Sequence, residues 1–141
     1  MKKTTKATTR SKGKVLFMDD AGDLREVIAS MLNESRYRVC VAKDGTEAIH
    51  HFKKAQRLGH PFDVVLLDIH VVEGMGGVEA LVKLREIEAG VKAILLTGDI
   101  NHPAVVNYET LGFKAAIIKP FTPRELLDVL SWVSTDGVEV N

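Results

Sequence analysis

Short apolar runs recur along the chain at similar distances, and longer segments of mixed character separate them. In each run the apolar residues follow one another directly instead of alternating with polar ones. That pattern is typical of a β-strand that is covered on both faces. The predicted strands are residues 15–18, 39–42, 64–67, 93–96 and 115–118.

The segments between the runs have the spacing of helices that bury one face. The last segment has the clearest start, because Thr122, Pro123 and Glu125 form a capping box with proline in the first turn. Asp44, followed three residues later by Glu47, predicts another capping box. We expect helices at about residues 24–32, 44–55, 77–89, 102–111 and 122–133, of which the fourth has the weakest pattern.

Five strands that alternate with five helices predict βαβ units, and these build a parallel sheet with helices on both faces. The chain has 141 residues, which is the size of one domain. We expect a flexible basic tail at residues 1–12, one folded α/β domain at 13–134 and a C-terminal tail at 135–141.

The net charge is zero, but the charges are unevenly placed. Residues 1–14 hold six basic residues and no acidic one, so the rest of the chain is acidic. We therefore expect no nucleic acid to bind the folded domain. The chain has neither the apolar segment of a signal peptide nor a run long enough to span a membrane, so we expect a cytoplasmic protein without membrane contact. Cys40 is the single cysteine, which argues against a disulfide framework and a cysteine-based metal site.

Chemically useful side chains stand directly after four of the five apolar runs. Asp19 and Asp20 follow the first run, Asp68 the third, Thr97 the fourth and Lys119 the fifth. In an open parallel sheet the carboxyl ends of the strands meet at one edge, where ligands bind. We therefore expect these five side chains to converge on one site, with Asp68 at its centre.

Three carboxylates in one crevice repel each other, by about 4 kcal/mol for two charges 4 Å apart at an effective dielectric constant near 20. A divalent cation with oxygen ligands removes this repulsion, and Mg²⁺ suits such a site better than zinc. Lys119 adds a positive charge and Thr97 a hydroxyl donor, which together stabilise a phosphoryl group in transfer. Asp68 can be the nucleophile and form an aspartyl-phosphate.

A simpler interpretation exists for each residue taken alone. An aspartate after a strand usually caps the next helix, as Asp20 could do. Complementary groups at four separate strand ends are harder to explain in that way, so the sequence favours a site.

These residues resemble the receiver domain of bacterial two-component response regulators. The matching positions occur in the order and with the separations of that family, and the resemblance covers about residues 13–134. They are Asp19-Asp20, Asp68, Thr97-Gly98 and Lys119-Pro120-Phe121. Residues 71–77, with the sequence VVEGMGG, are similar to a loop of receivers attached to hybrid sensor kinases.

The resemblance implies a flavodoxin-like fold, a doubly wound five-stranded parallel sheet with strand order 2-1-3-4-5. It implies that Asp68 accepts a phosphoryl group, in a Mg²⁺-dependent reaction, from a sensor histidine kinase or a histidine phosphotransfer protein. Thr97 would then move toward the phosphoryl group as the domain changes conformation. Such a domain catalyses only its own phosphorylation and dephosphorylation. A weak homodimer is a further expectation.

The same resemblance implies roles for the other site residues. Asp20, Asp68 and the main-chain carbonyl of His70 would hold Mg²⁺ directly, whereas Asp19 would act mainly through water. Lys119 would pair with Asp68 and later with the phosphoryl oxygens.

Two positions depart from the family. Val72 stands where a proline is usual, so we expect a less rigid loop after Asp68. Ala116 stands where the family often has an aromatic residue that changes rotamer on activation. The coupling between threonine and aromatic ring cannot operate here in that form.

Two alternatives stay open at this point. A phosphohydrolase with an aspartate nucleophile typically has the pattern D-x-D after its first strand, whereas this chain has adjacent Asp19 and Asp20. A receiver-like interaction module that is not phosphorylated would be favoured by the loss of any of the five site residues, and all five are present.

Overall fold

A computed structural model describes residues 10–135, and most of the tails predicted at 1–12 and 135–141 lie outside this range. The strands of these residues form one sheet. They are β1 (Gly13–Met18), β2 (Tyr37–Ala42), β3 (Val64–Asp68), β4 (Ala93–Thr97) and β5 (Ala115–Ile118).

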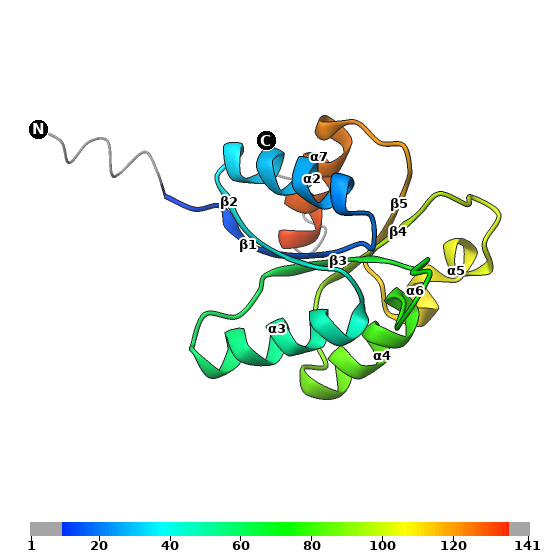
Figure 1. Cartoon of the computed structure of the whole chain (residues 1–141), viewed down its shortest axis with the longest axis horizontal. Helices are drawn as coiled ribbons and strands as arrows, with labels where there is room; N and C mark the ends of the chain where they lie inside the picture. Colours follow the sequence, from blue (N-terminus) through cyan, green and yellow to red (C-terminus); the bar gives the residue numbers. More distant parts are fainter. Residues whose placement is uncertain (1–9, 136–141) are drawn as a thin grey trace, which may run out of the picture.

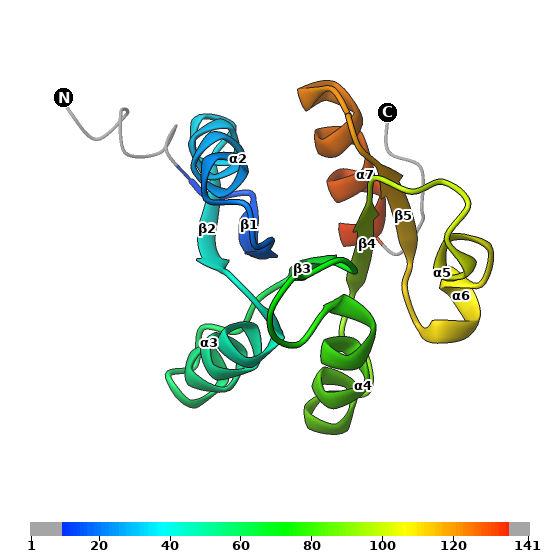
Figure 2. The same ribbon diagram turned by 45° about the vertical axis from the view of Figure 1, so that its right-hand side comes forward.

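The strands lie in the order β2-β1-β3-β4-β5 and all neighbours are parallel (Figure 2). The predicted fold class and strand order are confirmed. Every predicted apolar run is a strand, although β1 and β2 each begin two residues before the run. The chain goes from β1 out to the edge strand β2 and then returns past β1 to β3. The carboxyl ends of β1 and β3 therefore lie side by side at the point where such sheets bind ligands.

Helices connect the strands and cover both faces of the sheet (Figure 1). On one face lie α2 (Gly22–Glu34) and α7 (Pro123–Ser134), and on the other lie α3 (Gly45–Arg57) and α4 (Gly77–Ile87). Two short helices, α5 (Pro103–Val106) and α6 (Tyr108–Leu111), precede β5. No helix within residues 10–135 has the length and apolar character needed to cross a membrane.

The helix predicted at residues 102–111 is broken at Asn107, so the prediction of one continuous helix there is wrong. The side-chain amide of Asn107 donates to the carbonyl of Pro103 at 3.1 Å, and its main-chain N–H donates to the same carbonyl at 3.1 Å. Asparagine competes with the main chain in this way and disfavours an uninterrupted helix. The segment becomes α5 and α6, with Asn107 between them.

The hydrogen bonds at the starts of α7 and α3 can be compared with the two predicted capping boxes. At α7, Thr122 accepts from the N–H of Glu125 at 3.1 Å and Glu125 accepts from the N–H of Thr122 at 2.7 Å, which confirms the capping box. At α3, Asp44 accepts from the N–H of Glu47 at 2.9 Å. The carboxylate of Glu47, however, accepts from Lys43 at 2.8 Å. Asp44 therefore caps α3 as predicted, but the prediction of a full capping box is wrong. The Glu47 carboxylate bonds to the N–H of Lys43 instead of the N–H of Asp44, whose main chain is extended.

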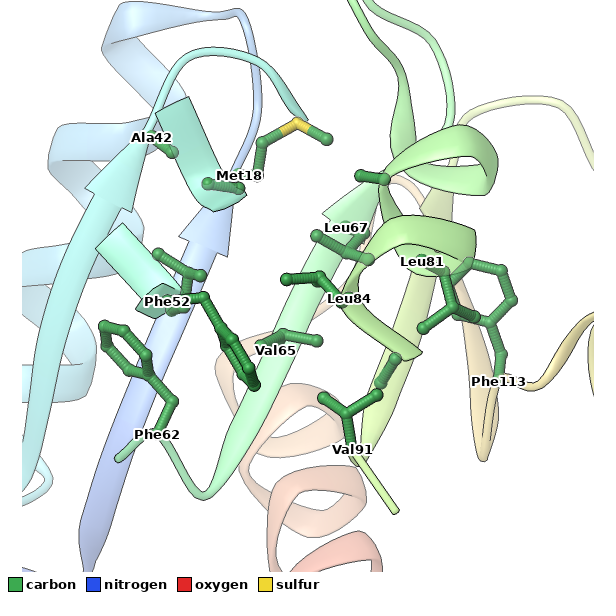
Figure 3. Close-up of a cluster of buried hydrophobic side chains, with 14 of the residues drawn as sticks. Met18, Ala42, Phe52, Phe62, Val65, Leu67, Leu81, Leu84, Val91 and Phe113 are labelled. Atoms are coloured by element: carbon green, nitrogen blue, oxygen red, sulfur yellow. The ribbon is translucent and has the colours of Figure 1, made fainter. Parts of the chain in front are cut away.

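Strand β3 is buried on both faces over its whole length, Asp68 included. Successive side chains of a strand point to opposite faces. Val64 and Leu66 pack in the apolar layer beneath α2 and α7, while Val65 and Leu67 pack in the layer beneath α3 and α4. Figure 3 shows the second layer, in which these side chains meet those of α3 and α4. The two layers fix β3 and with it the position of Asp68.

The start of α4 lies very close to the end of β3. A Cβ added at Gly77 would be 2.8 Å from the main-chain oxygen of Asp68 and 3.0 Å from the Cβ of Leu67. Glycine permits this approach because it has no side chain. The helix therefore begins directly against the strand end that carries Asp68.

We predict that Gly77→Ala lowers the free energy of unfolding by about 1–3 kcal/mol, the usual cost of overpacking. The added Cβ meets main-chain atoms, which cannot turn aside as a flexible side chain can. Gly90→Ala is the matched control, since a Cβ there meets nothing within 4 Å, and we expect a change within about 0.5 kcal/mol. Urea unfolding measures both values, and equal effects would contradict the close packing.

Candidate functional site

Three carboxylates meet at the carboxyl ends of β1 and β3. Asp19 and Asp20 follow β1 directly, and Asp68 is the last residue of β3. Each offers a carboxylate oxygen, and these oxygens lie within 4.8 Å of one another. Asp19 and Asp68 are only 0% and 3% exposed, whereas Asp20 is exposed. Two carboxylates are thus inside the domain and one is at its surface.

Lys119 follows β5 and reaches both buried carboxylates. Its Nζ donates to Oδ2 of Asp19 at 2.6 Å and to Oδ2 of Asp68 at 3.2 Å. The lysine side chain is 25% exposed, so water reaches it from part of its surface only. The resemblance implies a pairing with Asp68, and in the structure Asp19 is the nearer of two partners.

Main-chain N–H groups hold the aspartates that follow β1. Oδ1 of Asp19 accepts from Ala21 at 2.9 Å, so both oxygens of this carboxylate have protein partners. Oδ2 of Asp20 accepts from Val72 at 2.8 Å. Asp20 does not cap α2, whose N-cap is Ala21 without a side-chain hydrogen bond. Proline has no N–H, so Val72 ties its loop to Asp20 by a bond that the family's usual proline could not make.

His70 lies in the loop that follows Asp68, and Thr97 is the last residue of the neighbouring strand β4. The main-chain N–H of His70 donates to Oδ1 of Asp68 at 3.0 Å. Its exposed ring lies edge-to-face with the ring of His102, with centroids 5.1 Å apart. Thr97 is fully buried, and its hydroxyl accepts from the N–H of Asp99 at 3.0 Å. Within the part of the chain that the structure describes, no hydrogen bond joins Thr97 to Asp68.

The electrostatics of the site leave an excess of negative charge. Burial raises the pKa of Asp68 and the charge of Asp19 raises it further, against the opposing effects of the His70 N–H and the Lys119 ammonium. Burial would lower the pKa of Lys119, but its bonds to the two aspartates and their charges outweigh burial and raise it. Lys119 is therefore charged at neutral pH, and one cation faces three carboxylates. A second cation would relieve the repulsion.

The donor set at this site fits Mg²⁺. Among residues 10–135, the cluster that could hold a metal ion consists of three aspartates, without a histidine ring or a thiolate. Oxygen ligands of this kind suit a hard divalent cation, and an exposed member such as Asp20 leaves room for water ligands. Asp19 and Asp68 each have a protein partner at both oxygens, whereas the exposed Asp20 accepts from Val72 at Oδ2, so among the described residues Asp20 is the carboxylate most open to direct contact.

Comparison with known proteins identifies the family. Residues 15–131 match the family described as response regulator receiver domain. The chain belongs to this family. The receiver is similar to the chemotaxis protein CheY of Thermotoga maritima, with 29% identity over 122 residues, which is 86% of this chain and 97% of that protein. It is also 31% identical over 129 residues to the CAI-1 autoinducer sensor kinase/phosphatase CqsS of Vibrio cholerae, covering 89% of this chain but 18% of CqsS.

Solved structures show the same fold. A CheY-like receiver domain protein of Methanospirillum hungatei is 26% identical and superimposes with a TM-score of 0.78, over 90% of this chain and 97% of that one. CheY4 of Vibrio cholerae is 28% identical with a TM-score of 0.74, over 86% and 98% of the two chains. The chain is therefore a CheY-like receiver domain of two-component systems, a signalling domain whose family works with histidine kinases and typically binds Mg²⁺.

The structure also brings in a residue that sequence reasoning did not single out. Nη1 of Arg25, in α2, donates to the main-chain oxygen of Asp19 at 2.7 Å. The sequence feature that could have pointed to Arg25 is its place in the early turns of the helix that follows the acidic pair Asp19-Asp20. By itself that signal is weak, because an arginine on an amphipathic helix usually faces water.

We predict that Asp68→Asn raises the free energy of unfolding at pH 7 by about 1 kcal/mol when a chelator removes divalent cations. The folded state raises the pKa of Asp68, so ionisation of this group favours the unfolded chain. The free-energy cost of keeping Asp68 ionised in the folded domain is fully present at pH values above the folded pKa of Asp68. It disappears as the pH falls toward the pKa of an aspartate in the unfolded chain, about 3.9. The gain from Asp68→Asn should shrink in the same window.

Asp128→Asn is the control for this measurement. Asp128 lies on the surface of α7, where its contact with Arg124 is 3.8 Å long and both side chains are mostly exposed. We expect it to change stability by less than about 0.5 kcal/mol. Urea unfolding across pH 4–7 gives the comparison, and a loss of stability in Asp68→Asn would contradict the repulsion described for the site.

Proposed function

We propose that this receiver accepts a phosphoryl group on Asp68 from the phosphohistidine of a sensor histidine kinase or a histidine phosphotransfer protein. The observation that carries the proposal is the setting of Asp68: a buried carboxylate 3.2 Å from Lys119 and within 4.8 Å of oxygens of two other carboxylates. In the transfer a carboxylate oxygen of Asp68 bonds to phosphorus while the bond from phosphorus to the donor nitrogen breaks. That nitrogen keeps the electron pair.

The surrounding groups have distinct roles in the proposal. Asp20, Asp68 and the main-chain carbonyl of His70 would hold Mg²⁺, with Asp19 acting through water. When bound, the cation would neutralise charge on the oxygens of the phosphoryl group. Lys119 would keep Asp68 oriented before transfer and then pair with a phosphoryl oxygen.

Asp19 holds Lys119 throughout this sequence. Its contact with Nζ is the shorter of the two that Lys119 makes with the aspartates. Lys119 can therefore exchange its contact with Asp68 for a phosphoryl oxygen without leaving the site.

Thr97 links the site to the loop that follows β4. Its hydroxyl now accepts from the N–H of Asp99, and it has one O–H of its own to donate. We propose that this O–H donates to the phosphoryl group, which carries about −1.5 to −2 charges. The movement would break the bond to Asp99.

The loop beyond Thr97 offers a readout that needs no aromatic residue at Ala116. The main-chain oxygen of Asp99 accepts from the N–H of His102 at 3.1 Å. Nδ1 of His102 in turn accepts from the N–H of Ala104 at 3.0 Å and caps α5. Release of Asp99 would therefore loosen the entry to α5. The family's aromatic rotamer change has no part in this chain of bonds.

Family membership favours this function over a phosphohydrolase. The presence of all five site residues favours it over a receiver-like module that is not phosphorylated. The receiver-like loop at residues 71–77 and the similarity to CqsS agree with a hybrid-kinase relationship. The homodimer and the cytoplasmic location stay predictions. We also propose that His70 and Asp99, which stand two residues after Asp68 and Thr97, influence how long the phosphate persists by controlling the access of water. Both side chains are exposed, which is equally what loop residues without a role in the site would show.

We predict that the wild-type chain acquires a hydroxylamine-sensitive label from radiolabelled acetyl phosphate in Mg²⁺, and that Asp68→Asn lowers this label at least about 100-fold. An amide cannot form the acyl phosphate that a carboxylate forms. Asp128→Asn, which removes a distant carboxylate, should label normally. The same type of label in Asp68→Asn would reject the assignment.

The phosphohydrolase alternative has its own assay. We expect p-nitrophenyl phosphate in Mg²⁺ to yield no sustained turnover, because phosphoryl transfer here ends on the domain itself. Many equivalents of p-nitrophenol per chain would favour the hydrolase.

We predict that Thr97→Ala still labels at Asp68 but loses the response of the loop. In wild type and in Thr97→Ser, phosphorylation should speed hydrogen exchange at Asp99 and across residues 98–106, because the hydroxyl leaves the N–H of Asp99. In Thr97→Ala that exchange should be fast before phosphorylation and unchanged after it. An identical response in Thr97→Ala and wild type would exclude the hydroxyl as the link.

A further inference from the structure

We propose that Arg25 is a positioning residue of the acidic site, which orients the Asp20 carboxylate for a divalent cation through the peptide bond between Asp19 and Asp20. The proposal rests on the proposed function, since the cation is the one that transfer to Asp68 would use. It concerns a side chain on α2 that is six residues from Asp19 in the chain.

The contact of Arg25 completes the hydrogen bonding of Asp19. The N–H of Asp19 donates to Ala42 at 3.0 Å, and the carboxylate is held by Ala21 and Lys119. The main-chain carbonyl lies beyond the end of β1 and receives Nη1 of Arg25 at 2.7 Å. A partly buried carbonyl without a donor costs free energy, so Arg25 stabilises one orientation of this peptide group.

A fixed carbonyl at Asp19 constrains Asp20. The peptide group is planar, so the direction of the Asp19 carbonyl sets the plane in which the Asp20 nitrogen lies. The Asp20 side chain is then held by the N–H of Val72 at 2.8 Å. Because Asp20 is exposed, packing contributes little to its orientation. Two hydrogen bonds therefore orient this carboxylate. The bond from Arg25 fixes the peptide group that precedes Asp20, and the bond from Val72 fixes the Asp20 side chain.

The charge of Arg25 alone would have the opposite effect on a cation. Arg25 and Lys43 both line a cavity of about 430 Å³ beside Asp20. A positive side chain there repels a divalent cation, so its removal should tighten binding if charge were all that mattered. Among the described residues no carboxylate forms an ion pair with Arg25, and the side chain of Lys43 has no hydrogen bond to the acidic site. Lys43 is therefore a matched control for charge without positioning.

The test measures Mg²⁺ binding to the full chain by titration calorimetry. We expect Arg25→Met to weaken binding by about threefold to tenfold, at or below the lower limit of the effect of outer-shell partners on metal affinity, because Arg25 acts through the main chain. Lys43→Met should tighten binding by up to about twofold, as loss of a repelling charge requires. Arg25→Lys keeps a charge and a donor, and should return affinity to within about twofold of wild type.

Two results would overturn the proposal. Tighter binding in Arg25→Met, as in Lys43→Met, would mean that Arg25 acts through charge alone. A lower Tm in Arg25→Met with unchanged Mg²⁺ affinity would mean that it only stabilises the fold. Arg25→Gln, which is neutral and shorter, serves if Arg25→Met does not fold, and the same weakening is expected.

Labelling of Asp68 provides a second readout. In Arg25→Met the Mg²⁺ concentration for half-maximal labelling should rise about threefold to tenfold, in step with the weaker binding. The maximal rate at saturating Mg²⁺ should stay within about twofold of wild type, since Asp68 and Lys119 are unchanged. A wild-type chain that neither binds Mg²⁺ nor labels would refute the proposed function and this inference together. A wild-type chain that does both, with Arg25→Met behaving as Lys43→Met, refutes this inference alone.

Discussion

The pairing of Lys119 with two buried carboxylates is the interaction on which the rest of the site depends. Asp19 and Asp68 end up inside the domain because apolar layers cover both faces of β1 and β3 up to their last residues. A buried carboxylate without a partner would cost several kcal/mol, and one lysine serves both. The compensation is incomplete, because the pKa of Asp68 remains raised. Three carboxylates around one lysine leave an excess of negative charge, and this excess favours a further positive charge at the site.

The same carboxylates organise the loops around them. Asp19, Asp20 and Asp68 accept hydrogen bonds from the main chain at Ala21, Val72 and His70 respectively. These bonds tie two loops that the sheet does not hold, the loop after β1 and the loop after β3, to the site. A change of charge at Asp68 acts directly on the bond from His70. The loop after β4 is tied in the same manner, through the hydroxyl of Thr97. A conformational switch requires strands that stay in place and loops that can exchange one set of hydrogen bonds for another, because the main-chain groups of the strands are already paired within the sheet.

The strands and their alternation with helices follow from the sequence, because unbroken apolar runs bury both faces. The sequence also predicts that Asp19, Asp20, Asp68 and Lys119 meet, because the ends of parallel strands share one edge. The finer features depend on single hydrogen bonds that no periodicity encodes. Asn107 divides a helix by bonding back to Pro103, and Glu47 reaches Lys43 instead of Asp44. The nearer pairing of Lys119 with Asp19, and the reach of Arg25 to the carbonyl of that residue, required the three-dimensional arrangement.

The most direct test of the central claim is the chemical identity of residue 68 after phosphorylation. The full chain is incubated with acetyl phosphate and Mg²⁺, reduced with borohydride and digested, and its peptides are sequenced by mass spectrometry. An aspartyl-phosphate is reduced to homoserine, whereas a free aspartate is not. We expect homoserine at position 68 and aspartate at positions 19 and 20. Homoserine at either of those positions, or unaltered aspartate at position 68 in a chain that carries phosphate, would contradict the central claim.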